Sequence, residues 1–308
     1  MVNELGIFTV DDAAGTINGL APNAAGYAQA ALDRGKAIFS TISNAPTGFS
    51  ATGISRLLEL NTNDKVRFYL VKNSTTDSVQ KKLTPLSDVL FASTNSLRVT
   101  SGSADKFTLS WQDGSDNSAN FNNLVVNIEA SNEDLPLGVG LQGNTEAELI
   151  DLRTATKSTT AEFTVNREAA FNNFVGFYRV ADAQGGIDTN NDGKADILVG
   201  QSGYIQSAIS NRVAGIDLTV SNQGTASYTG LFQPSSIFAP FIIVNGRPEE
   251  LLDSNASNDP AVYFPFLGAN SDKVDHIRLL GNNIFGFEDL PSGGDRDFND
   301  VIVRVKLT

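Results

Sequence analysis

The strongest constraint on the fold of this 308-residue chain is an internal repeat. Three short blocks of the first half recur in the same order in the second half, two of them at the same offset. They pair residues 5–18 with 175–188, residues 26–31 with 203–208, and residues 121–126 with 298–303. Ordered blocks of this kind predict two copies of one structural unit.

The composition and periodicity of the chain predict an all-β fold. Abundant glycine (27 residues), a low charged fraction (19%) and frequent Ser, Thr, Asn and Asp are typical of short strands joined by polar turns. Strands are expected at 5–10, 65–72, 89–92, 97–100, 106–111, 123–129, 160–166, 174–180, 215–220, 239–245, 261–266, 276–280 and 300–306. Helix is expected only at 26–39, which has good helix formers, and at its counterpart 203–212.

We therefore predict two related antiparallel β-sandwich domains, jelly-roll-like, with one short helix each. Residues 1–130 form a diverged first copy, and residues 172–308 form the second. Residues 131–171 connect the copies and contain two alternating segments, at 147–152 and 161–166, that predict further strands. The second of these segments leads directly into the second copy. The first copy has no such strand before it, which predicts an open sheet edge there.

Charge and cysteine content restrict the partners of the chain. There are 35 acidic and 22 basic residues, a net charge of −13, which predicts no binding to nucleic acid. No apolar run approaches the roughly 20 residues needed to span a bilayer, so no membrane insertion is expected. Cysteine is absent, which excludes disulfides and thiolate metal ligands and leaves oxygen-ligated cations as the natural partners.

The main candidate site lies near the C-terminus, in a glycine-rich turn between two apolar segments. Six oxygen-bearing side chains fall within 13 residues: Glu288, Asp289, Asp295, Asp297, Asn299 and Asp300. They would repel one another without a cation, and Ca²⁺ takes about six to eight oxygen ligands. Gly293 and Gly294 would let backbone carbonyls approach the same ion. The alternative is a solvated turn in which Asp and Asn cap backbone amides.

Residues 285–303, FGFEDLPSGGDRDFNDVIV, resemble the hallmark of the bacterial domain-of-unknown-function family numbered 4114. Residues 167–171, 175–178 and 203–204 are similar to upstream blocks of that family, so the resemblance covers roughly 160–308. Members are usually large exported surface or matrix proteins, often beside other calcium-dependent repeats. The resemblance thus implies a location better than it implies an activity.

A second candidate calcium site lies in the segment by which the second copy is longer than the first. Oxygen ligands stand at positions 1, 3, 5 and 9 of a calcium-loop pattern, as Asp188, Asn190, Asp192 and Asp196. Gly193 occupies position 6, but position 12 is Val199, and no long helices are expected on either side. An EF-hand is therefore not predicted, and a metal-free Asx-rich turn is the alternative.

A third candidate lies in the first copy, where residues 107–123 correspond to the C-terminal acidic turn. This stretch keeps Asp113, Asp116 and Asn120, but it has Ser110 and Trp111 near the positions of Glu288 and Asp289. Asp113 and Asp116 are the candidate calcium ligands of this copy.

These features predict a secreted calcium-binding structural protein of the bacterial cell surface or extracellular matrix. Its partners would be further copies of itself, in filaments or layers formed by strand addition, or other components of the cell surface or biofilm matrix. The alternative is a calcium-dependent carbohydrate-binding or adhesin module, with Trp111, Tyr178 or Tyr204 stacking on a glycan. No catalytic role is predicted, since the acids cluster in metal-like loops and the single histidine, His276, cannot serve a triad elsewhere.

Overall fold

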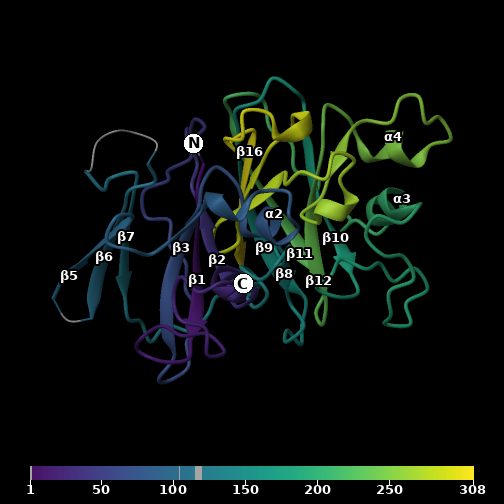
Figure 1. Ribbon diagram of the computed structural model, residues 1–308. Helices are drawn as coiled ribbons and strands as arrows, with labels where there is room; N and C mark the ends of the chain where they lie inside the picture. Colours follow the sequence, from purple (N-terminus) through teal and green to yellow (C-terminus); the bar gives the residue numbers. More distant parts are fainter. Residues whose placement is uncertain (1, 104, 115–119) are drawn as a thin grey trace. The chain divides into compact units, whose positions relative to one another are not determined.

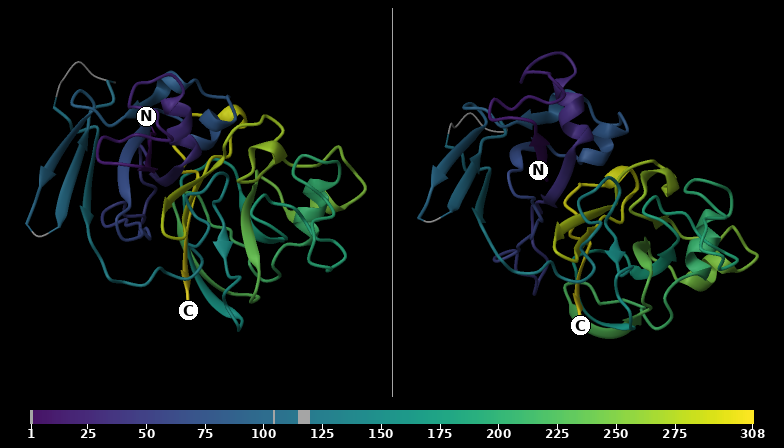
Figure 2. Two further views of the ribbon diagram at one scale, coloured as in Figure 1. Left: turned by 60° about the horizontal axis from the view of Figure 1, so that its bottom comes forward. Right: turned by 90° about the horizontal axis from the view of Figure 1, so that it is seen from below.

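The computed structural model describes residues 2–103, 105–114 and 120–308 (Figure 1). The described chain divides into two compact units. The N-terminal unit contains residues 3–37 and 59–135, and the C-terminal unit contains Val2, residues 38–58 and residues 136–308. The sheets are antiparallel and the helices are short, so the all-β prediction is confirmed (Figures 1 and 2).

The C-terminal unit contains two sheets. The larger has five strands in the order β11 (Thr225–Phe232), β9 (Thr159–Arg167), β16 (Val301–Leu307), β15 (Ile284–Phe287) and β14 (Ile277–Gly281). The smaller has the order β10 (Phe174–Val180), β12 (Ile237–Ile243) and β13 (Val262–Tyr263), and β8 (Ile150–Asp151) also pairs with β12. Two helices, α3 (Tyr204–Ser210) and α4 (Pro248–Leu252), complete the unit with the 3₁₀ turns η2 (Leu267–Ala269) and η3 (Pro291–Gly293).

Two apolar cores lie on opposite faces of the smaller sheet. One joins both sheets and includes Phe163 of β9, Phe177 of β10 and Phe285 of β15, each at most 1% exposed. The other includes Tyr178 of β10, Phe241 of β12 and side chains of both helices. Because successive residues of a strand point to opposite faces, Phe177 and Tyr178 serve different cores. The C-terminal unit is thus a β-sandwich with two helices on one outer face.

The N-terminal unit is built on the same plan with fewer strands. One sheet has the order β2 (Gly35–Ser40, of which residues 35–37 belong to this unit), β1 (Glu4–Val10), β3 (Lys65–Val71) and β4 (Val89–Phe91). The other has the order β5 (Leu97–Ser101), β6 (Lys106–Trp111) and β7 (Leu124–Glu129). The helices α1 (Tyr27–Asp33) and α2 (Thr76–Gln80) and the 3₁₀ turn η1 (Leu86–Asp88) complete it, and both α-helices contribute to the core that includes Phe8.

The predicted repeat appears as paired contacts in the two units. The Tyr27 hydroxyl donates to the Gly15 carbonyl at 2.7 Å, and the Tyr204 hydroxyl donates to the Gly185 carbonyl at 2.8 Å. The guanidinium of Arg98 lies 4.0 Å from the centre of the Phe121 ring, and that of Arg278 lies 3.9 Å from the centre of the Phe298 ring. Both phenylalanines have a φ of 54°. These pairs fix which residues of the two units are equivalent.

The domain boundaries differ from the predicted ranges. Residues 38–58 come from the first half but belong to the C-terminal unit, where Arg56 donates to the carbonyl of Gln142 and the side chain of Asn282. Most of 131–171 is also part of that unit, because β9 lies between β11 and β16. Each unit has two α-helices where one was predicted.

Several elements also differ from the predicted strands and helices. The expected helix at 26–39 ends at Asp33, and β2 follows it. The expected strand at 215–220 contributes one isolated bridge, from Leu218 to Val175. The strand β11 was not predicted. Among the described residues, no helix is long and apolar enough to cross a membrane.

Candidate metal centre

The acidic turn lies between two adjacent strands of the five-stranded sheet. Glu288 and Asp289 directly follow β15, and Asp300 directly precedes β16. The Glu288 amide donates to the His276 carbonyl at 3.0 Å, which continues the pairing of β15 with β14 beyond the strand end. The backbone between the strands doubles back through positive φ at several positions, including Gly294 (47°) and Phe298 (54°). The sheet therefore fixes both ends of the turn.

Five carboxylates converge in this turn. Ligand oxygens of Glu288, Asp295 and Asp297 lie within 4.8 Å of one another, and so do ligand oxygens of Glu288, Asp289 and Asp300. Glu288 belongs to both groups, so it is the centre of the acidic cluster. The cluster contains all five predicted carboxylates of this segment.

The cluster is buried on one side and open on the other. Glu288 is 0% exposed and its Oε2 atom has no hydrogen-bond partner, whereas Asp295 is exposed. Among the described residues, no lysine, arginine or histidine nitrogen forms an ion pair within 4.0 Å of these five carboxylates. A buried carboxylate without a counter-charge is costly, so this arrangement requires either protons or a cation.

The pKa values of the cluster reflect this crowding. Burial and, next, the charge of Asp289 raise the pKa of Asp300 to about 9. Burial and the charge of Asp295 raise the pKa of Glu288 to about 7. Burial is also the main reason that the pKa of Asp297 is raised to about 6 and that the pKa of Asp289 is raised. Without a cation, part of the cluster therefore holds protons at neutral pH.

Groups outside the turn hold the carboxylates in place. The Asn173 side chain, just before β10, donates to Asp289 Oδ2 at 2.7 Å, and the Asp289 amide donates to Asp300 Oδ2 at 2.7 Å. Sequence reasoning missed Asn173, which lies 116 residues from Asp289. The sixth predicted ligand, Asn299, is buried, and its side-chain nitrogen donates to the Asn44 carbonyl at 3.3 Å.

Gly294 leaves space for the central carboxylate. A Cβ atom at this position would lie 2.2 Å from Glu288 Oε1, far inside van der Waals contact. The turn therefore approaches Glu288 more closely than any residue with a side chain would allow. This close approach and the unpartnered Oε2 atom fit an ion bound among the carboxylates.

Residues 232–308 match the family described as a domain of unknown function, DUF4114. The matched region contains β12 and everything after it, including the whole acidic cluster. The predicted resemblance is confirmed for these residues, and the match does not extend to the first copy. No curated protein and no solved structure matches the chain.

Outside the DUF4114 match, the N-terminal unit repeats the scaffold of the cluster. The Asn3 side chain donates to Asp113 Oδ2 at 2.8 Å, as Asn173 does to Asp289. The Asp113 amide donates to Asn123 Oδ1 at 3.1 Å, as the Asp289 amide does to Asp300. Asp113 is therefore the equivalent of Asp289, and Asn123 is the equivalent of Asp300.

This correspondence corrects the predicted alignment, which put Ser110 and Trp111 near the positions of Glu288 and Asp289. The equivalent of Glu288 is Gln112, whose amide donates to the Ser96 carbonyl at 2.9 Å. The equivalent of Asp297 is Asn120, because each accepts a backbone amide two residues later at 3.3 Å. Asp116 lies outside the described residues. At the four described equivalents, the first copy has one carboxylate where the DUF4114 region has four.

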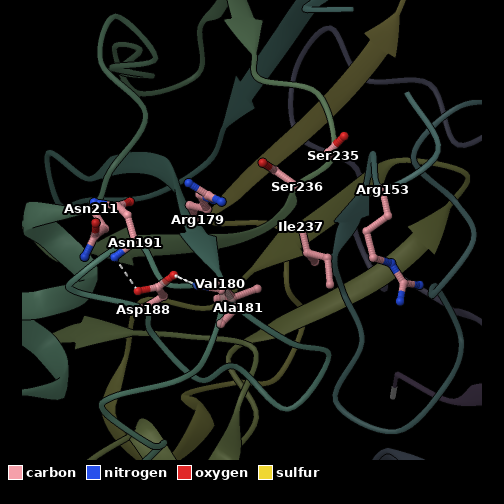
Figure 3. Close-up of a pocket in the computed structure, with 11 residues that line it drawn as sticks. Arg153, Arg179, Val180, Ala181, Asp188, Asn191, Asn211, Ser235, Ser236 and Ile237 are labelled. Carbon is pink, nitrogen blue, oxygen red and sulfur yellow. Dashed lines mark hydrogen bonds between the residues drawn. The ribbon is translucent and has the colours of Figure 1, made fainter. Parts of the chain in front are cut away.

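In the predicted calcium loop at 188–196, the carboxylates accept hydrogen bonds from backbone and side-chain groups of the same loop. Asp188 accepts backbone amides from Asn191 at 2.6 Å and Gly193 at 2.8 Å (Figure 3). Burial by itself raises the pKa of Asp188. The backbone amides that donate to its carboxylate have the larger combined effect, so the net pKa lies below the ordinary value. Hydrogen bonds from Thr189 lower the pKa of Asp196, while the Asn190 side chain donates to Asp196 and the Lys194 amide to Asp192.

The residues of this loop are not among the acidic groups that converge within 4.8 Å in the described chain. Asp188, Asn191 and Gly193 instead line a polar pocket together with Arg153, Arg179 and other residues (Figure 3). The hydrogen bonds make this segment an Asx-rich turn, and calcium binding by it stays a prediction.

Proposed function

We propose that this chain is a calcium-binding structural protein of the bacterial cell surface or extracellular matrix, in which the ion holds the folded state together. The observation that carries the proposal is Glu288, which is fully buried, shared by two groups of carboxylates and left with an unpartnered Oε2 atom. A cation in the acidic cluster would neutralise it and would link the end of β15 to the start of β16.

The donor set favours calcium among the common metals. All five side-chain donors are carboxylate oxygens, which suit hard cations, and the chain contains no cysteine. The one histidine is engaged elsewhere, since the His276 ring nitrogens contact the Glu288 carbonyl at 2.9 Å and Asp272 Oδ2 at 3.0 Å. Each of the two carboxylate groups offers three oxygen-bearing side chains, and a carboxylate can bind Ca²⁺ through one or both oxygens, with water completing the roughly six to eight ligands that the ion takes.

The position of the cluster supports a structural role. It joins two neighbouring strands of one sheet, so binding stabilises the folded form by mass action. The carboxylates form two groups that share Glu288, each within 4.8 Å, whereas glycoside hydrolysis needs two carboxyl groups placed on opposite sides of a substrate. We therefore propose a role without catalysis, at a surface where calcium is abundant.

The three aromatic side chains that would stack on a glycan in the carbohydrate-binding alternative are buried in the protein. Trp111 and Tyr178 are 0% exposed, and Tyr204 is 2% exposed. Tyr178 and Tyr204 form a hydrogen-bonded, edge-to-face pair in the core. None of the three offers a face on which a sugar ring can stack.

Calcium titration by calorimetry, with thermal unfolding and size analysis of the same sample, tests the proposal. We expect saturable calcium binding and an unfolding midpoint that is higher in calcium than in excess chelator. Self-assembly through sheet edges would add calcium-stable particles larger than one chain. Equal midpoints in calcium and chelator, with no heat of binding, would exclude a structural ion.

A further inference from the structure

The outer edge of β7 is unpaired in the N-terminal unit. The strand is the last of the order β5-β6-β7, and among the described residues its backbone hydrogen bonds run only to β6 and the turn next to it. Its side chains alternate between half-buried and exposed positions. It contains neither proline nor lysine, two of the devices that protect sheet edges from pairing with another chain.

The same edge is covered in the C-terminal unit. There β9 pairs antiparallel with β16, and Val303 faces Val165 while Val305 faces Phe163. The equivalence of Asn123 with Asp300 places Val126 at the position of Val303 and Ile128 at that of Val305. Val303 and Val305 are at most 3% exposed, whereas Val126 and Ile128 remain half-buried. In the part of the N-terminal unit that the structure describes, β7 thus has the inward-facing side chains of a covered strand, and no described strand pairs with this edge.

Charge distinguishes the strand that would fit on β7 from β9 itself. In the C-terminal unit Lys306 of β16 pairs with Glu162 of β9 at 3.2 Å. The position equivalent to Lys306 on β7 is Glu129, which forms an ion pair with Lys106 of β6 at 2.5 Å. A strand carrying Glu162 would place two carboxylates opposite each other, which is unfavourable. A basic residue at that position would extend the alternation of charge across the sheet.

We propose that the β7 edge accepts an extended segment of another polypeptide, antiparallel to β7, as a fourth strand of this sheet. The segment has the alternation of β9, with apolar side chains facing Val126 and Ile128, and it carries Lys or Arg opposite Glu129. Backbone hydrogen bonds supply affinity in such strand addition, and the alternate side chains supply specificity. The inference rests on the surface role in the proposed function, and it names a basic partner segment, in place of a further copy of this chain, as the occupant of the β7 edge.

The test uses two fluorescent peptides and the full chain in saturating calcium. One peptide is residues 159–167, TTAEFTVNR, and the other is its E162K form, TTAKFTVNR. We expect the E162K peptide to bind about fivefold more tightly by fluorescence anisotropy, from the usual size of cross-strand charge effects. Its binding should protect the amides of residues 124–129 from hydrogen exchange. Glu129→Lys in the protein should reverse the order of the two peptides.

Lys306→Glu is the matched control, because it changes the charge at the equivalent position of a strand whose edge is already paired. It should leave both peptide affinities unchanged, and circular dichroism should show both variants folded.

The proposal is overturned if neither peptide binds, or if Glu129→Lys leaves the order of the two peptide affinities unchanged. It is also overturned if the chain alone self-associates with protection of residues 124–129, since a second copy would then occupy the edge. Calcium binding is measured on the same samples, so its failure with peptide binding intact would affect only the proposed ion site.

Discussion

Asp289 and Asp113 occupy equivalent positions, and each accepts a hydrogen bond from the asparagine just before an equivalent strand, β10 or β1. They differ in their neighbours, because only Asp289 converges with other carboxylates in the described chain. We therefore expect Asp289→Asn to weaken calcium binding about tenfold, since the affinity of such sites depends on the number of charged ligands. Calorimetric titration of the variant measures the change.

Asp113→Asn is the matched control for this prediction. The new amide keeps an oxygen that can accept from Asn3, so the variant should fold and should bind calcium as the parent chain does. An equal loss of affinity in the two variants would show that the first copy also binds an ion, as the sequence alone predicted.

The pKa values of the acidic cluster predict how stability without calcium depends on pH. Burial raises the pKa of Asp300 to about 9 and that of Glu288 to about 7, above the unfolded values of roughly 4. The folded state then binds more protons than the unfolded state, so this contribution is complete below about pH 4 and is lost as the pH rises through about 9. In chelator, we expect the unfolding midpoint of the C-terminal unit to fall between about pH 5 and 9.

Saturating calcium should remove that decline, because the ion binds the ionised carboxylates. Asp300→Asn should reduce the decline in chelator, since it removes the group with the highest of these pKa values. Parallel midpoint curves in calcium and chelator across this pH range would contradict the account of the cluster.

At the scale of residues, the sequence located the acidic cluster but not its support. Five carboxylates within 13 residues are visible without a structure, because nearby positions of a tight turn must be close in space. Asn173 could be found only through the repeat, by extending the alignment of Leu5 with Val175 two residues backwards to Asn3. Without the strand register, the sequence alignment also paired Glu288 and Asp289 with residues two positions too early, so it missed their equivalents Gln112 and Asp113.

At the scale of elements, one substitution can distinguish the two interpretations of the loop at 188–196, a calcium-binding loop and a metal-free Asx-rich turn. Asp188 accepts amides across the loop, including that of Gly193 at 2.8 Å. Asp188→Ala should therefore lower the unfolding midpoint in calcium and in chelator alike, with the calcium affinity of the chain unchanged. Loss of one bound calcium ion in the titration of this variant would favour the calcium-loop interpretation.

The strands with clear alternation or apolar runs were predicted, whereas elements determined by distant contacts were not. β11, with the sequence TASYTGLF, has weak alternation, and it is a strand because Tyr228 and Gly230 face Phe163 and Ala161 of β9. The helix expected at 26–39 ends at Asp33 because β2 begins at Gly35, where a Cβ would lie 2.9 Å from the Tyr69 hydroxyl and the chain has entered the sheet. Tertiary packing of this kind overrides local propensity.

For the whole molecule, the repeat predicted two related sandwiches, but it could not show that the chain passes from one unit to the other after residues 37, 58 and 135. Residues 38–58 join the C-terminal unit before the chain returns to complete the N-terminal unit. Arg56 anchors this segment through four hydrogen bonds, to Ile38, Gln142 and Asn282. Burial lowers the pKa of Arg56 to about 10, so its charge is retained at neutral pH.

The single tryptophan makes the two units distinguishable in one unfolding experiment. Trp111 is 0% exposed at the end of β6, in the N-terminal unit, while the acidic cluster lies in the C-terminal unit. Calcium at about one hundred times its dissociation constant stabilises a folded domain by about 2.7 kcal/mol. For a unit of this size, that corresponds to a rise of about 5–11 °C in the unfolding midpoint.

The His276 proton resonances report on the C-terminal unit. We expect calcium to raise the unfolding midpoint that they measure by this amount, about 5–11 °C. Tryptophan fluorescence should shift by less than about 2 °C, because the first copy keeps one carboxylate among the four described equivalents of the cluster. Calorimetry should then resolve two transitions in calcium whose separation changes in chelator. Equal shifts in both signals would mean that the units unfold together, and that a single ion between β15 and β16 controls the folding of the whole chain.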